Sequence, residues 1–303
     1  MPQIRPIPAI TFTAPSGDVS SLIAPPYDVL DQRDKDALLA RNNSNIVGVD
    51  LPHLPAKTVG PDSTYDAAGK KYRDWLAKGV LGRRARPALY VYQQTYNVGG
   101  GASGGAVGSA VGKKLQRRGL VANVTVQPFG KSASGKGGIH PHEQTFSGPK
   151  EDRMKLMLAT QAQLSPIFGL HSDPTNRIGP LLAGVIDRSP PVLRGTTSND
   201  GVLHEMWAVD DAFRQQPLIE AFDGADIFIA DGHHRYSTAL NYRNKLLAER
   251  GDAGLPENHP ANHCLFVLVA LQDPGLIILP THRVLGGMTV SYTHLTLPTK
   301  RIV

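Results

Sequence analysis

Cysteine is almost absent from this chain of 303 residues, in which Cys264 is the single example. One cysteine excludes an intramolecular disulfide and any zinc centre that is built from cysteine ligands. Because Cys264 stands in an apolar run, we expect its thiol to serve as a small core group.

Long hydrophobic runs are missing as well. The longest, Cys264–Leu271, has the length of a strand and falls far short of the roughly 18 apolar residues that a membrane helix needs. The first residues, Met1–Pro6, lack the apolar stretch of a secretory signal. The sequence therefore predicts a cytoplasmic protein without a membrane partner.

Acidic residues are the minority among the charged ones, with 26 against 32 lysines and arginines and a formal net charge of +6. Such an excess favours anionic ligands in general. The two basic clusters, 83–86 and 113–118, contain no aromatic residues that could stack on bases, and no helix-turn-helix is recognisable. We therefore do not expect a nucleic-acid partner, and nothing in the sequence specifies an oligomeric state.

Hydrophobic periodicity predicts strands and helices that alternate along much of the chain. This succession is typical of the α/β to α+β classes, with a mixed sheet and flanking helices. Asp62 is expected to cap its helix, and Gly79 to end it. The predicted helices are Asp31–Asn42, Asp62–Lys78, Pro149–Gln163, Ile178–Ile186 and Asp210–Phe222. The predicted strands are Ile46–Leu51, Leu89–Val98, Gly119–Phe129, Pro166–His171, Val202–Val209 and Cys264–Leu271, the last paired with Leu276–Leu279 as a hairpin.

Two segments depart from a globular pattern. Residues 98–112 are so rich in glycine that burial cannot offset the entropy of ordering them, so we expect a flexible insertion. Residues 290–299 resemble a translated sequencing adapter, which predicts that 289–303 are a foreign tail. The sequence then corresponds to one truncated α/β domain over residues 1–288.

The most informative segment is Ile227–Leu240, where an apolar strand turns at Asp231 and Gly232 into a helix. The first N–H groups of such a helix are unpaired, and its dipole attracts anions. Gly232 permits close approach of a ligand, and Arg235 offers a fork for two phosphate oxygens. Alternatively, Asp231 merely caps the helix and the histidines are surface groups. Because cations are disfavoured at a helix N-terminus, His233, His234 and Arg235 favour the anion-site interpretation.

A second group of polar residues is His140-Pro141-His142-Glu143. Two imidazoles and a carboxylate at this spacing can hold a divalent metal, or Glu143 can act as a general base. The helix that follows carries Lys150 and Arg153, which could face the phosphate site. An ordinary polar loop remains the alternative for all of them.

Five blocks together resemble the domain-of-unknown-function family 1015. They occur in that family's order from near the N-terminus to about Leu285. The blocks are Ala24–Val29, His140–Thr145, Ser147–Arg153, Leu164–Leu170 and Ile229–Tyr236. The glycine-rich insertion departs from the family pattern.

Within this resemblance, the Asp-Gly-His-His-Arg turn is similar to the phosphate-binding motif of the ParB/sulfiredoxin fold. The resemblance implies that Gly232, His233, His234 and Arg235 contact nucleotide phosphates, and it suggests Glu143 as the base for a substrate hydroxyl. We add Asp231, Tyr236, Lys150 and Arg153 as candidate phosphate-binding residues, and the candidate catalytic residues are Glu143, His142 and His233. A sulfiredoxin activity is excluded because the turn has no cysteine.

Three functions stay open on the sequence alone. The first is a phosphotransferase that uses ADP or ATP with Mg²⁺ and acts on a small hydroxyl metabolite such as serine. The second is a non-enzymatic nucleotide switch of the ParB type. The third is a metal-dependent hydrolase that uses His140, His142 and the adjacent pair His233 and His234; the phosphotransferase needs no metal site built from the protein's own residues.

Overall fold

A computed structural model describes residues 2–98 and 112–278. Most of the predicted glycine-rich insertion and all of the predicted foreign tail lie outside these residues. None of the described helices is long and apolar enough to cross a membrane.

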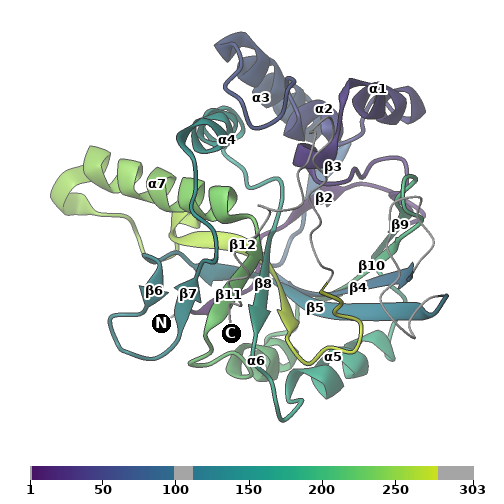
Figure 1. The fold of residues 1–303 in the computed structure, drawn as a ribbon, viewed down its shortest axis with the longest axis vertical. Helices are drawn as coiled ribbons and strands as arrows, with labels where there is room; N and C mark the ends of the chain where they lie inside the picture. Colours follow the sequence, from purple (N-terminus) through teal and green to yellow (C-terminus); the bar gives the residue numbers. More distant parts are fainter. Residues whose placement is uncertain (1, 99–111, 279–303) are drawn as a thin grey trace, which may run out of the picture.

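The centre of the fold is one ten-stranded mixed sheet (Figure 1). Its strand order is β6-β7-β11-β8-β12-β5-β4-β10-β9, and β1 also pairs with β5. Strand β12 runs parallel to β8, and β11 runs parallel to β7, whereas the other pairings are antiparallel. The mixed sheet with flanking helices confirms the predicted class. The strands are β1 Ile4–Arg5, β4 Leu89–Asn97, β5 Lys114–Thr125, β6 Gly130–Lys131, β7 Gly138–His140, β8 Ile167–His171, β9 Leu193–Thr196, β10 Leu203–Val209, β11 Ile227–Asp231 and β12 His263–Ala270. A separate two-stranded sheet joins β2 Ile10–Phe12 to β3 Leu81–Arg83.

The helices form two groups in Figure 1. Helices α1 to α4 lie together above the sheet with α7 beside α4, and α5 and α6 lie at its opposite side. The main core joins sheet residues to apolar side chains of α5, α6 and α7, while α2, α3 and α4 share a second core with β3. The helices are α1 Gln32–Arg41, α2 Val47–Asp50, α3 Asp62–Ala77, α4 Ser147–Thr160, α5 Ile178–Ile186, α6 Ala212–Glu220 and α7 His233–Arg250.

The predicted strand Ile46–Leu51 is wrong, because this segment forms the short helix α2. Its two valines are fully buried, which satisfies an apolar pattern without strand pairing. The buried Asn45 directs the turn: its side chain accepts a hydrogen bond from the Val47 N–H and donates to the carbonyls of Ser21 and Ile23. A local side-chain bond of this kind overrides strand propensity.

Two further predictions need correction. Asp62 does not cap α3, since Pro61 occupies the cap position and the Asp62 carboxylate instead pairs with Lys155 at 2.7 Å. The predicted hairpin after β12 is also wrong where it is described, because residues 276–278 form no strand. Asp273 closes a tight turn there, accepting from the Gly275 N–H.

Candidate functional site

The Asp-Gly-His-His-Arg turn lies where β11 ends and α7 begins. The buried Ile227 and Ile229 fix β11 in the sheet, and the exposed Asp231 ends it. Gly232 has a φ of 98°, a left-handed conformation that side chains rarely adopt. The predicted sharp strand–turn–helix is therefore present, with Gly232 itself in the cap position.

A second helix begins beside this turn. The Phe146 N–H, at the start of α4, donates to Nε2 of His234 at 3.2 Å, and one turn further Thr238 Oγ1 donates to the Lys150 carbonyl at 3.4 Å. The first turns of α4 and α7 thus lie side by side. Neither helix has a side-chain cap among the described residues. The positive ends of two helix dipoles consequently meet at one place, which favours an anion there.

The two histidines of the turn accept hydrogen bonds from the loop before α4. Nε2 of His233 accepts from the His142 N–H at 3.2 Å, much as Nε2 of His234 accepts from Phe146. Burial, and next the neighbouring His142, lower the pKa of His233; burial and then Lys57 lower the pKa of His234. Both imidazoles are therefore neutral near pH 7, with the proton on Nδ1.

Arg235 is held by the protein itself. Its guanidinium donates to the Pro166 carbonyl and to the Asp231 carboxylate, and its side chain is only 17% exposed. Neutral histidines and a paired arginine already remove the conflict between cations and the helix N-terminus. The case for an anion site therefore rests on the two adjoining helix starts and not on this conflict.

Glu143, in the loop before α4, lies near His233 and His142, the other two candidate catalytic residues. Its Oε2 lies 3.7 Å from Nδ1 of His233, and its Oε1 lies 3.9 Å from Nε2 of His142. Nδ1 of His142 lies 2.8 Å from the Ile229 carbonyl, which fixes the proton on that nitrogen and leaves Nε2 as the lone-pair nitrogen of the neutral ring. Glu143 and His142 are both more than half exposed, so a substrate can reach them.

Two lysines supply positive charge at the same edge. The Lys57 carbonyl lies 3.5 Å from the position that a Cβ on Gly148 would take, and the Lys150 carbonyl accepts from Thr238 of α7. Both lysines lower the pKa of His234. Lys57 also pairs with Asp28 at 2.9 Å while staying 45% exposed. Lys57 was not singled out from the sequence, because the loop before it carries no motif, whereas Asp28 belongs to the Ala24–Val29 block.

The family model described as "Protein of unknown function (DUF1015)" matches residues 4–297. The chain belongs to this family. The family resemblance found in the sequence is thereby confirmed, and the match reaches into the segment for which a foreign origin stays a prediction. No curated protein and no solved structure matches the chain.

In this DUF1015 chain, two of the predicted phosphate ligands lie in other surroundings. Arg153 is buried and bonds to Asp152 and Asp50. Tyr236 is fully buried, and its hydroxyl donates to the Gln127 carbonyl at 2.7 Å and accepts from the Gln127 N–H at 3.0 Å. Both side chains are therefore bonded to protein groups in the interior in this structure.

The chemistry of the DUF1015 site depends on its donor set. The described residues contain no group of three or more His, Cys, Asp or Glu side chains that could hold a metal. His140 pairs with Asp226 at 2.8 Å instead of joining His142. The hydrolase interpretation therefore has no ligand set in the described part of the chain, and the arrangement favours anion binding beside a carboxylate base.

Proposed function

We propose that this DUF1015 chain binds a nucleotide and transfers its terminal phosphoryl group to the hydroxyl of a small metabolite such as serine. The observation that carries the proposal is the pair of uncapped helix starts beside Lys57, Lys150 and Glu143. Helix N-termini and lysines bind phosphates, and phosphoryl transfer depends largely on such positioning and charge. The similarity of the turn to the ParB/sulfiredoxin motif supports the same class of ligand.

Access decides which groups meet the phosphates. Phe146 and Ser147, at the start of α4, are exposed, whereas Gly232 and His233 are buried. The Phe146 N–H is bonded to His234 and Pro149 has none, so the start of α4 offers the N–H groups of Ser147 and Gly148, and α7 adds its dipole. Lys57 and Lys150 add positive charge beside His234.

Glu143 is the group we assign to the acceptor. In the reaction, the hydroxyl oxygen forms the new P–O bond, the bond to the nucleotide breaks, and the hydroxyl proton passes to the Glu143 carboxylate. The Nδ1–H of His233 lies 3.7 Å from this carboxylate, so a small movement of the exposed Glu143 side chain brings the two to hydrogen-bond distance. His142, with its exposed Nε2, is placed to receive the proton in turn.

A magnesium ion would neutralise phosphate charge in this reaction. Asp28 pairs with Lys57 and Asp231 pairs with Arg235, whereas Glu143 has no lysine or arginine partner in the part of the chain that the structure describes. One free carboxylate fits an ion that is held mainly by phosphates and water. The residues present therefore fit Mg²⁺ only as part of a nucleotide complex.

The test is phosphoryl transfer from ADP or ATP, with Mg²⁺, to a panel of amino acids that includes serine. Glu143→Gln should lower the rate of transfer by at least a hundredfold, whereas Glu249→Gln, at an exposed position near the far end of α7, should not change it. Lys150→Gln should raise the KM for the nucleotide. Arg235 is a poor choice for this test, because its replacement also removes the hydrogen bonds to the Pro166 carbonyl and the Asp231 carboxylate and so changes the structure of the turn.

Absence of product with every acceptor and both donors would overturn the phosphotransferase. Nucleotide binding is measured separately, as an increase in the melting temperature that is lost in Lys57→Gln/Lys150→Gln. Binding without transfer would indicate the non-enzymatic switch, and absence of binding would reject both interpretations.

A further inference from the structure

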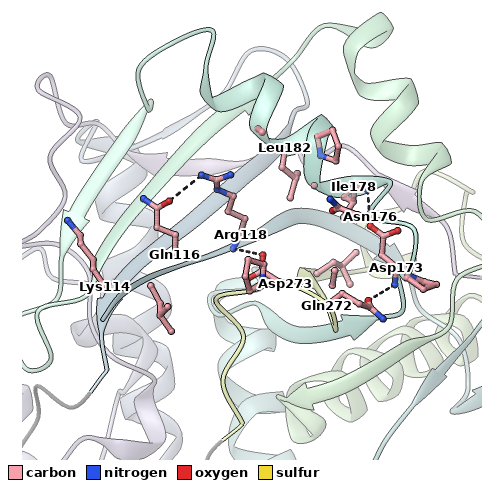
Figure 2. Close-up of a pocket in the computed structure, with 17 residues that line it drawn as sticks. Lys114, Gln116, Arg118, Asp173, Asn176, Ile178, Leu182, Gln272 and Asp273 are labelled. Carbon is pink, nitrogen blue, oxygen red and sulfur yellow. Dashed lines mark hydrogen bonds between the residues drawn. The ribbon is translucent and has the colours of Figure 1, made fainter. Parts of the chain in front are cut away.

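A cavity of about 830 Å³ lies at the opposite end of β8 and β12 from the histidine turn (Figure 2). It opens between the start of β5, the start of α5 and the turn after β12. The Cys264 end of β12 approaches Arg235, whereas Leu268 and Ala270, further along the same strand, line this cavity. Its size is that of a pocket for a small organic ligand.

One arginine faces the cavity without a carboxylate partner. The Arg118 guanidinium donates through Nε to Gln93 Oε1 at 2.8 Å and through Nη2 to Gln116 Oε1 at 3.2 Å. Figure 2 shows its side chain between Gln116 and Leu182. Among the described residues, Arg118 forms no ion pair, and its Nη1 donates no hydrogen bond. The two amides orient the guanidinium without forming an ion pair with it, which leaves its Nη1 face open to an anion.

The two acidic residues of the cavity are bound to backbone groups. Asp173 accepts from the N–H groups of Arg177 and Ile178, both at 2.9 Å, at the start of α5. Asp273 accepts from the N–H groups of Gly275 and Arg118, at 2.8 and 3.3 Å (Figure 2). Their carboxylates thus shape the cavity wall, and among the described residues neither forms an ion pair with the Arg118 guanidinium.

The rest of the lining is largely apolar. Leu182 and Leu268 are buried side chains of α5 and β12, and Ala183 and Ala270 extend the same surface. An arginine fork above an apolar floor matches a ligand with a planar anionic head and a hydrocarbon body. We propose that this cavity is a binding site for an amphipathic carboxylate, with Arg118 on the carboxylate and α5 and β12 around the apolar part.

This site is independent of the proposed phosphotransferase, so each can fail alone. The probe is octanoate, compared with the neutral octanamide, in a ligand-observed NMR titration of the full chain. Octanoate should bind at least ten times more tightly than octanamide. Arg118→Gln should remove this preference, because a bidentate bond to a charged group is lost.

Arg117→Gln is the matched control. Arg117 is the next residue of β5, points to the other face of the sheet, and is likewise held by a glutamine, Gln94. This variant should keep the preference for octanoate. Ala183→Phe should fill the cavity and weaken the binding of both probes. An unchanged melting temperature of Arg118→Gln would show that this variant keeps its fold. Absence of octanoate binding, equal affinity for the two probes, or an equal effect of both arginine variants would overturn the proposal.

Discussion

Replacing Arg153 by methionine is the sharpest test of how the site is supported. The central carbon of the guanidinium lies over the Tyr27 ring, 3.9 Å from the ring centre. The group donates to Asp152 Oδ2 at 2.8 Å and to the Asp50 carbonyl at 2.8 Å. Asp152 is fully buried, and Asp50 nearly so. Methionine fills similar space but leaves two carboxylates in the interior without their cation.

Breaking a buried ion pair by removing one partner costs about 3–5 kcal/mol of the free energy of unfolding. For a chain of this size, that loss corresponds to a fall in melting temperature on the order of 10 °C. Chemical denaturation and calorimetry of Arg153→Met measure it. The control is Arg194→Met, since the Arg194 guanidinium is 62% exposed and 3.7 Å from Glu205, so that solvent screens the pair and its loss should cost less than about 1 kcal/mol.

The double variant Asp152→Asn/Arg153→Met should recover part of the loss, because the amide carries no charge to bury. A destabilisation of Arg153→Met below about 1 kcal/mol, or equal effects of Arg153→Met and Arg194→Met, would refute the reasoning. Arg153 would then be free for a ligand, as the sequence alone suggested.

Three further outcomes follow from the geometry. Gly232→Ala should lower the free energy of unfolding by about 1–2 kcal/mol in urea, because φ is 98° and the new Cβ would lie 3.2 Å from the Arg235 guanidinium; a neutral effect would contradict the left-handed turn, and Gly184→Ala in the open part of α5 should not destabilise. Burial lowers the pKa of His171, so the folded chain keeps this ring neutral and loses stability as pH falls below about 6.5, by at most about 1.4 kcal/mol per pH unit for this one proton; His171→Leu should make the dependence shallower, and an unchanged slope would argue against it. Burial raises the pKa of the Cys264 thiol to about 12, so a thiol reagent at pH 8 should label the protein only after unfolding; rapid labelling of the native protein would contradict this packing.

Much of the fold follows from local signals. Helix α3 and its end at Gly79 were predictable because Tyr65, Tyr72 and Trp75 recur on one face and pack together in the core. The turn at Gly232 was predictable because an apolar strand ends at a glycine that a helix follows. Periodicity failed at Ile46–Leu51, where a buried asparagine and not the valines decides the backbone.

The candidate site was predictable in part. The loop of Glu143 and the turn of His233 are widely separated in sequence, and the fold brings the two side chains to 3.7 Å from each other; the roles assigned to them stay predictions. That His233 and His234 act as neutral acceptors for backbone N–H groups could not be seen, because it depends on the path of the 142–146 loop. The same holds for Lys57, which reaches the site from a distant loop, and for Arg235, whose partner Pro166 precedes β8.

The side-by-side starts of α4 and α7 carry an energetic consequence. Like ends of two dipoles repel each other, so the fold bears an electrostatic cost at this edge for as long as no negative charge lies between them. Relief of that cost adds to the intrinsic affinity of the site for an anion. A bound anion also ties the helical layer of α4 to the sheet through α7, and it should therefore suppress local opening of both helices, including backbone N–H groups that it does not touch.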